Sequence, residues 1–253
     1  DDPHEVRLSR RAYAIAQASR LSADWSRTPA SPQREVRDAW TASLARARDL
    51  YANTSHVKGY IHHRLPAQVL GRKGLVLQPR VETSRGKQNR RINDQIARAW
   101  KDWCRVGVCT MDGRHSWRDV QRLALEGLAR DGEILLRFVR GRTARDHGFA
   151  LQLLEPEHLD ATYEGRTTQN QTVTMGVELD RWRRPRAYHV LTENPYGDTF
   201  QRYARKRLPA SEILHSFVSL YPGQVRGLSW LHAAAGDARM MAKYREAELV
   251  AAR

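Results

Sequence analysis

Apolar residues recur at the spacing of a helix face in three long stretches of the chain. The clearest stretch covers residues 35–52, and its stripe consists of Val36, Trp40, Leu44, Ala47 and Leu50. A second helix is expected over residues 116–130, because Ser116 can cap its start and Gly132 can end it in a left-handed turn. The third helix is predicted by a stripe of Ile92, Ile96, Trp100 and Trp103.

Shorter patterns complete the predicted elements. Residues 55–70 are expected to be helical with a break near Pro66. Runs of aliphatic and aromatic residues predict strands over residues 69–79, 133–139, 149–154, 173–179, 186–192 and 212–218. A basic tip at 140–147 separates the second and third of these strands, and a turn at 180–185 joins the fourth and fifth into a hairpin. Helices and antiparallel strands together predict an α+β fold.

Residues 229–253 predict a final helix that begins with the small residues Ala233, Ala234, Ala235 and Gly236. Small side chains allow helices to approach closely, although alanine also simply favours helix. Further along, spacings of four and three place on one polar face Arg239, Lys243 and Glu246. The alternative is an ordinary amphipathic surface helix. The pattern shows no stop signal before Arg253, so we expect the natural chain to continue.

Composition and charge limit the class of protein. The chain has 253 residues, 41% of them hydrophobic, with a formal charge of +15. This excess favours a polyanionic partner, most commonly nucleic acid, although a solvated basic surface or an acidic protein partner also fits. No apolar run approaches the ~18 residues of a membrane span, and the first residues lack the apolar core of a signal peptide. With only two cysteines, a disulfide framework is not expected.

Candidate chemistry is sparse. Cys104 and Cys109, with His115 beyond them, could begin a zinc site, but no second cysteine pair supplies the remaining ligands. Carboxylates that a metal-dependent nuclease could use form three clusters: Asp131 and Glu133; Glu155, Glu157 and Asp160; Glu178 and Asp180. Leu135 stands where one nuclease pattern requires lysine, and turn and capping roles explain the acids more simply. Since no G-x-S-x-G, H-E-x-x-H or Walker motif occurs, we predict no catalytic, cofactor-binding or metal-binding residues.

Several segments together carry a family resemblance. They are SLARARDLYANTSHVKGYI, VLGRKGLVLQP, DGEILLRFVR, LQLLEPEHLD, GVELDRWRRPRAYHVL and LPASEILHSFVSLYPGQVRGLSW. In this order and spacing they resemble the lambda-type portal proteins of tailed bacteriophages, over nearly the whole chain. The resemblance implies a structural protein and not an enzyme, built as an α+β, portal-like subunit with a helical wing, two stem helices and a β-rich clip.

The resemblance also implies a role for each segment. Residues 1–34 correspond to an N-terminal arm and linker, and residues 35–114 to a wing-like helical part with short strands. Residues 115–140 correspond to a stem helix and strand, residues 141–228 to the β-rich clip, and residues 229–253 to the second stem helix. In a ring, the polar face of that second stem helix would look toward the DNA channel.

Portal resemblance implies partners and a location. About twelve copies would form a ring at one capsid vertex of the virion, after assembly in the host cytoplasm and without contact to a membrane. The ring would surround the channel for DNA packaging and ejection, and would contact the packaging ATPase (terminase), head-completion or adaptor proteins and the major capsid protein. A charge of +15 would hold DNA strongly in a smooth channel, so we expect most of it to lie elsewhere. The alternative function is a DNA-binding enzyme such as a metal-dependent nuclease.

Overall fold

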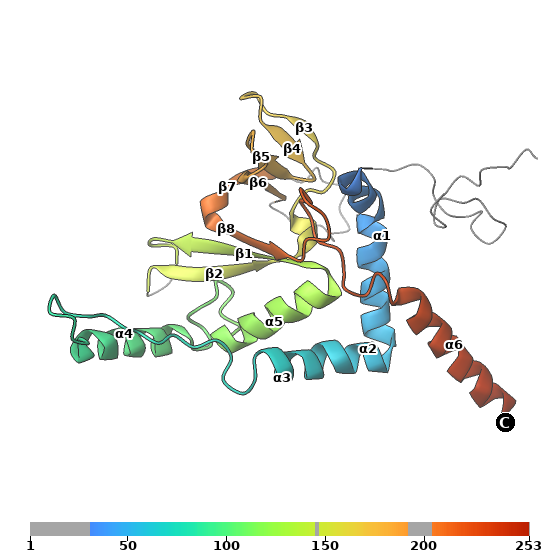
Figure 1. Ribbon diagram of the computed structural model, residues 1–253, viewed down its shortest axis with the longest axis horizontal. Helices are drawn as coiled ribbons and strands as arrows, with labels where there is room; N and C mark the ends of the chain where they lie inside the picture. Colours follow the sequence, from blue (N-terminus) through green and yellow to red (C-terminus); the bar gives the residue numbers. More distant parts are fainter. Residues whose placement is uncertain (1–30, 145–146, 192–203, 253) are drawn as a thin grey trace, which may run out of the picture.

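The structure is a computed structural model that describes residues 31–144, 147–191 and 204–252 (Figure 1). The described chain is α+β and contains two antiparallel sheets with helices beside them, which confirms the predicted class. The smaller sheet has the strand order β2-β1-β8, and the larger sheet has the order β3-β4-β5-β6-β7. Among the described residues, every helix is too short or too polar to span a lipid bilayer.

The long helix α1 (Pro32–Asn53) confirms the first apolar stripe, because all five of its residues are buried. Pro32 stands in the first turn, where a missing N–H group costs nothing. After Thr54 the chain turns into α2 (Ser55–Gly59), which leads away from the end of α1 (Figure 1).

A widened turn replaces the break that was expected near Pro66. The π-helical turn η3 (Tyr60–Arg64) runs directly into α3 (Leu65–Val69), so the helical path continues through the proline. Proline has no N–H group and crowds the turn before it. The preceding residue, Leu65, therefore donates its amide to Tyr60 across a five-residue step. The irregularity lies one turn before the proline.

Helix α5 (Trp117–Arg130) confirms the predicted cap and stop. The Ser116 side chain accepts a hydrogen bond from the Asp119 amide, and the Asp119 carboxylate accepts one from the Ser116 amide. The helix ends at Gly132, which has a φ of +93°. A Cβ at Gly132 would lie 2.2 Å from the carbonyl carbon of Leu228, so the site also requires a residue without a side chain.

The smaller sheet combines strands from distant parts of the sequence. Strand β1 (Glu133–Arg140) pairs on one side with β2 (Phe149–Leu154) and on the other with β8 (Ile213–Phe217). All three strands lie close to their predicted positions. The pairing also shows that segment 141–228 is not one continuous β block, because its two ends join β1 while its middle builds the larger sheet.

The larger sheet confirms the predicted hairpin but corrects its surroundings. A tight turn at Met175 and Gly176 divides the expected strand 173–179 into two. Neither edge of the β5–β6 hairpin is free for a further strand, because β4 pairs with β5 and β7 pairs with β6. The five strands are β3 (Gly165–Arg166), β4 (Thr172–Thr174), β5 (Val177–Leu179), β6 (Pro185–Leu191) and β7 (Arg205–Pro209).

The core lies between the two sheets and beneath the smaller one. Leu135 from β1 packs with Tyr188 and Val190 from β6 in the cluster between the sheets. On the opposite face of the smaller sheet, a second cluster joins β1 and β2 to α5 and to Trp103. Two short 3-10 turns, η4 (Pro156–His158) and η5 (Ala210–Glu212), connect the layers.

A projecting arm replaces the strand expected at 69–79. Residues 75–80 run without strand pairing, and Leu75, Val76 and Leu77 are 66%, 58% and 46% exposed. The arm turns back through the bridge between Glu82 and Gln88 and returns along α4 (Arg90–Trp103). Only the end of α4 is anchored, by buried Trp103, and the rest extends outward (Figure 1). We call residues 71–105 the basic arm.

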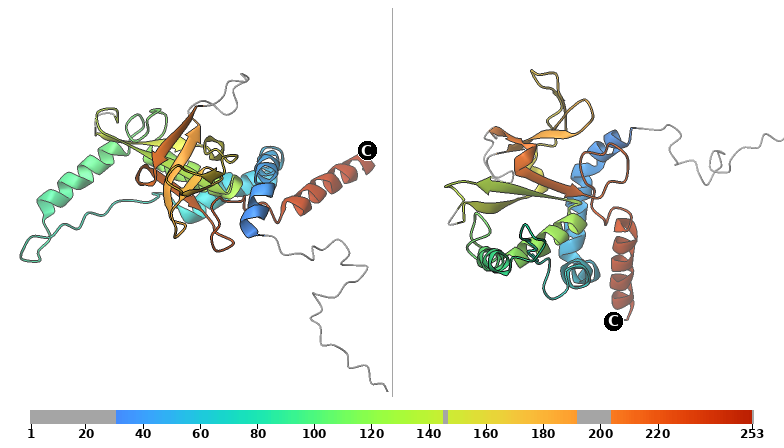
Figure 2. Two further views of the ribbon diagram at one scale, coloured as in Figure 1. Left: turned by 90° about the horizontal axis from the view of Figure 1, so that it is seen from above. Right: turned by 60° about the vertical axis from the view of Figure 1, so that its left-hand side comes forward.

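The last helix begins later than the sequence predicted. Helix α6 spans Ala235–Ala251, whereas residues 230–234 form turns. The hydrogen bonds around Ser229 are the physical reason. The Ser229 hydroxyl accepts a hydrogen bond from the Leu231 amide, and the Trp230 amide donates to the Ala129 carbonyl in α5. Helix α6 then leaves the body at the end opposite the basic arm (Figure 2).

Candidate assembly and DNA-contact surfaces

Helix α6 presents large apolar side chains to solvent. None of its residues is buried. Five of its large apolar side chains are between 63% and 69% exposed: Met240, Met241, Tyr244, Leu249 and Val250. These side chains stand around the helix and not on one face, and so many exposed large apolar side chains on one projecting helix favour a partner that covers it. The helix is therefore the best candidate for a contact surface in the described chain.

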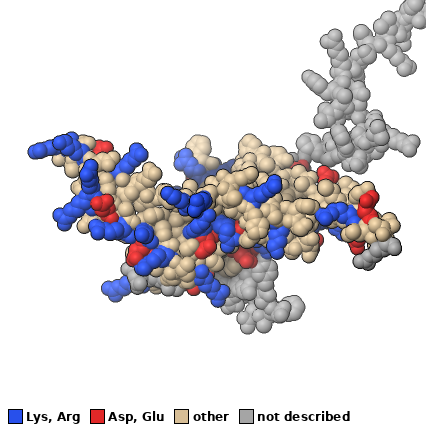
Figure 3. All heavy atoms as spheres, turned by 90° about the horizontal axis from the view of Figure 1, so that it is seen from below, with Lys and Arg blue, Asp and Glu red and all other residues tan. Residues whose placement is uncertain are grey.

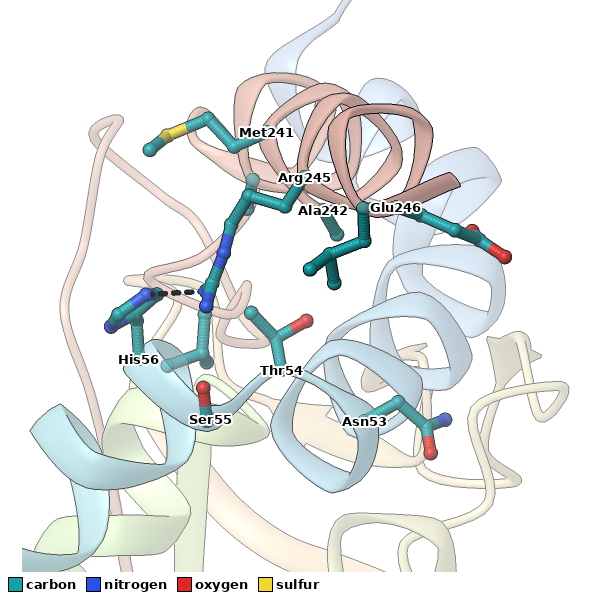
Figure 4. Close-up of a pocket in the computed structure, with 11 residues that line it drawn as sticks. Asn53, Thr54, Ser55, His56, Met241, Ala242, Arg245 and Glu246 are labelled. Carbon is teal, nitrogen blue, oxygen red and sulfur yellow. Dashed lines mark hydrogen bonds between the residues drawn. The ribbon is translucent and has the colours of Figure 1, made fainter. Parts of the chain in front are cut away.

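A groove of about 390 Å³ separates α6 from the junction of α1 and α2 (Figure 4). Its α6 side is lined by residues one and two turns apart, including Ala238, Met241, Ala242 and Leu249. Its other wall includes Thr54 and Val57. One polar contact crosses it, between Arg245 Nη1 and His56 Nε2 at 2.9 Å. Helix α6 therefore contacts α2 through this pair, and the groove between them stays open.

The structure places the three sequence-predicted channel residues on α6, and all three are exposed. Glu246 borders the groove, whereas Arg239 and Lys243 do not line it. The three side chains therefore lie on one side of α6, and this side meets the groove at Glu246. At the start of the helix, a Cβ added to Gly236 would meet no atom within 4 Å. The neighbouring Ala235 is half-buried and lines a pocket with Ala39 and Ala42 of α1, so only part of the expected small face is open within the described residues.

Comparison with known proteins decides the family. The model of the family described as "phage portal protein, lambda family" matches residues 18–253 of the chain. The chain belongs to the lambda family of phage portal proteins. A probable portal protein of Halomonas phage phiHAP-1 is 34% identical over 248 residues, which is 96% of this chain and 47% of that protein. The chain thus spans about half the length of the curated relative it matches.

The portal family is structural and not enzymatic, and most of the carboxylates considered for a nuclease have partners within the fold. Glu133 is completely buried, and the buried Arg226 guanidinium donates to both of its carboxylate oxygens, with Nε at 2.8 and 3.0 Å. His215 Nε2 lies 3.0 Å from the same carboxylate. Burial alone would raise the pKa of Glu133, but Arg226 and His215 outweigh it and lower the pKa to about 2.

The other acidic clusters follow the same pattern. Arg207 donates to both oxygens of Glu178 at 2.7 and 2.8 Å, and Arg205 Nε donates to Asp160 at 2.8 Å. Arg48 binds both Asp131 and Glu157. Asp180 instead holds the β5–β6 turn, by accepting hydrogen bonds from the amides of Trp182 and Arg184. The described residues contain no group of three His, Cys, Asp or Glu side chains that could hold a metal ion.

The two cysteines are separate thiols. Cys109 is buried in the cluster beneath the smaller sheet, and its thiol donates to the His115 carbonyl, with 3.2 Å between sulfur and oxygen. Burial raises the pKa of this thiol to about 11, so it remains protonated at neutral pH. Cys104 is partly exposed, and burial raises the pKa of its thiol as well. Both act as small apolar residues of the portal subunit.

Sequence reasoning missed Arg226, the central polar residue of the fold. It binds Glu133 on β1, and its guanidinium also lies 4.3 Å from the ring centre of Trp40 on α1. It stands in a loop between Gln224 and Gly227, where no periodic pattern distinguishes a buried arginine from an exposed one. The available signal was its place in the run LPASEILHSFVSLYPGQVRGLSW, which resembles the family.

Proposed function

We propose that this chain is part of a ring-forming portal subunit that surrounds the channel for phage DNA. The family match over residues 18–253 carries the proposal. The geometry supports it through α6, whose exposed apolar residues need a partner. A closed ring requires each subunit to present two different complementary surfaces, one to each neighbour. Helix α6, at one end of the long axis, is the candidate for one of them.

The remaining partners follow from the ring. About twelve copies would stand at one capsid vertex of the virion, where the ring would contact the major capsid protein. The packaging ATPase would dock during DNA filling, and head-completion or adaptor proteins would dock afterwards. Assembly would take place in the host cytoplasm, and the chemistry of the subunit would be limited to positioning double-stranded DNA.

Arg239, Lys243 and Glu246 are the proposed channel residues of α6. All three are exposed on a helix that projects from the body. A mixed set of two cations and one anion would contact phosphates without the strong hold of a purely basic surface. Lys243→Glu is therefore expected to leave the ring intact and to change DNA passage or retention.

The test uses the full-length protein, examined by light scattering and electron microscopy for closed rings. We expect wild-type rings, and we expect Met240→Glu with Tyr244→Glu to reduce ring yield without changing the secondary structure of the subunit. Lys206→Glu, on an exposed position of β7, is the matched charge control and is expected to assemble normally. Wild-type protein that remains monomeric or dimeric under assembly conditions would contradict the proposed function.

The nuclease alternative makes a different prediction. Such an enzyme would cut DNA in the presence of Mg²⁺ and would lose this activity when an acidic pair is replaced. Most of the acids that it needs are bound to arginines in the fold, and Asp180 holds a turn, so no observation favours it. Mg²⁺-dependent cleavage by the pure protein, abolished by Glu178→Gln, would establish it.

A further inference from the structure

The excess positive charge of the chain is concentrated in the basic arm. Residues 71–105 contain ten Lys and Arg and three Asp and Glu, a net of +7 within a chain total of +15. All ten basic side chains are exposed. Figure 3 shows Lys and Arg gathered at the left-hand end of the molecule, which is the end that the basic arm occupies in Figure 1.

The arm cations differ from five arginines of the body. Arginines 48, 130, 205, 207 and 226 each bind a carboxylate inside the described fold. Among the described residues of the arm, the one cation with a carboxylate partner is Arg105, which binds Asp102. The other nine, from Arg72 to Lys101, have no ion-pair partner in the described chain. Internal pairing therefore does not explain the arm charge.

The start of α4 is a second sign that these charges serve an external contact. Arg90 and Arg91 occupy the first turn, and that turn contains no acidic residue. Cations at a helix N-terminus oppose the helix dipole and leave the helix slightly less stable. Residues that break a local stability rule without an internal partner are expected where function requires them.

The chemistry of the arm indicates its ligand. The rest of the chain is also net positive, so net charge does not favour a second copy as the ligand. Seven of the ten arm cations are arginines, whose planar guanidinium suits phosphate oxygens. We propose that the basic arm binds the phosphate backbone of double-stranded DNA, without reading its sequence. The choice of DNA as the polyanion rests on the proposed function, whereas the phosphate contact rests on the arm itself.

The test measures salt-dependent binding of a mixed-sequence DNA duplex to the full-length protein, by fluorescence anisotropy. The arm variant combines Arg85→Gln, Lys87→Gln and Arg91→Gln. The plot of log affinity against log salt has a negative slope, and each lost phosphate contact makes it about 0.9 less steep. The slope of the arm variant should therefore be about 2 to 3 less steep than that of the wild type. At 0.1 M salt, we expect binding at least about tenfold weaker. The thermal midpoint should not fall, because these side chains are exposed and unpaired.

The matched control removes the same charge from the larger sheet. Arg184→Gln, Arg186→Gln and Lys206→Gln replace exposed cations on and near β6 and β7. We expect this variant to keep the wild-type affinity and salt slope. Equal losses in the arm variant and the control would overturn the inference, since total charge and not the arm would then determine binding. Polyglutamate that displaces the duplex as effectively as unlabelled duplex does would also overturn it, in favour of an acidic protein ligand.

Ring formation is measured separately on the same samples by electron microscopy. Rings in the arm variant with reduced DNA affinity would support the inference. Rings with unchanged affinity and slope would overturn it and leave the proposed function standing. Absence of rings in the wild type would instead contradict the proposed function, whatever the arm variant shows.

Discussion

Replacement of Arg226 by methionine tests the buried ion pair that joins the sheets. The guanidinium is completely buried and donates to the Glu133 carboxylate. It also donates to three backbone carbonyls, those of Pro156 at 2.9 Å, Met175 at 3.1 Å and Leu159 at 3.3 Å. Methionine is also an unbranched side chain, but it carries no charge and no hydrogen-bond donor. Four groups from three segments of the chain would lose a partner together.

The expected cost is large. Removal of one member of a buried ion pair leaves an uncompensated charge and costs about 3–5 kcal/mol. Each abandoned carbonyl adds roughly 1 kcal/mol where water cannot replace the donor. The variant should therefore lose about 4 kcal/mol or more of unfolding free energy. Since domains are stable by only ~5–15 kcal/mol, this is a substantial fraction.

The pH dependence gives the loss a specific signature. In the wild type, the pKa of Glu133 is lowered from 4.5 to about 2, so its contribution to stability is complete above pH 4.5 and disappears toward pH 2. This shift in pKa corresponds to a contribution of ~3 kcal/mol to the free energy of unfolding. Without Arg226, burial should instead raise the pKa of Glu133, and protonation then relieves the unpaired charge. The stability difference between wild type and variant should narrow from pH 7 to pH 4.

Urea unfolding, followed by the fluorescence of the seven tryptophans, measures the loss of unfolding free energy and its dependence on pH. Arg37→Met is the control, because Arg37 pairs with Glu164 at 3.0 Å on the surface, where water and salt weaken an ion pair. The double variant with Glu133→Gln should recover part of the loss, since no buried charge remains. The reasoning is refuted if Arg226→Met costs no more than Arg37→Met at pH 7, or if its cost is the same at pH 4.

Three further substitutions test single positions. Gly132→Ala, at a φ of +93° and with a Cβ 2.2 Å from Leu228, should cost about 2 kcal/mol or more and lower the thermal midpoint; an unchanged midpoint would contradict this close approach. Val190→Pro removes the amide of a residue paired with Lys206, so strand content by circular dichroism should fall; normal rings and spectra would contradict the pairing. Gly236→Leu should leave subunit folding unchanged and hinder ring closure, and assembly at normal yield would refute close packing there.

The elements that the sequence predicted correctly are those whose signals are local. Helix α1 follows from a complete apolar stripe, and α5 follows from the capping box at Ser116 and the stop at Gly132. The hairpin of β5 and β6 follows from two apolar runs around a polar turn. In each case the residues that specify the element lie within a few positions of it, so one sequence contains the information.

The elements that the sequence predicted wrongly depend on distant contacts. The run at Leu75–Leu77 has the composition of a strand, but no strand in the described subunit lies beside it. Residues 229–234 contain good helix formers, yet the chain there is held to α5 through Ser229 and Trp230. Composition predicts the preference of a segment, whereas pairing and anchoring decide whether the preference is realised.

Arginine has two different uses in this chain, and composition alone could not separate them. In the body, arginines such as Arg207 and Arg226 neutralise buried carboxylates and connect strands, so they leave little charge outside. In the basic arm, residues such as Arg85 and Arg91 are exposed and unpaired within the described chain. The charge of +15 correctly predicted an excess over internal pairing. Because nearly half of the net charge, +7 of +15, lies on a projecting arm at the end opposite α6, the arm is a stronger candidate for phosphate contacts than the mixed charges of α6.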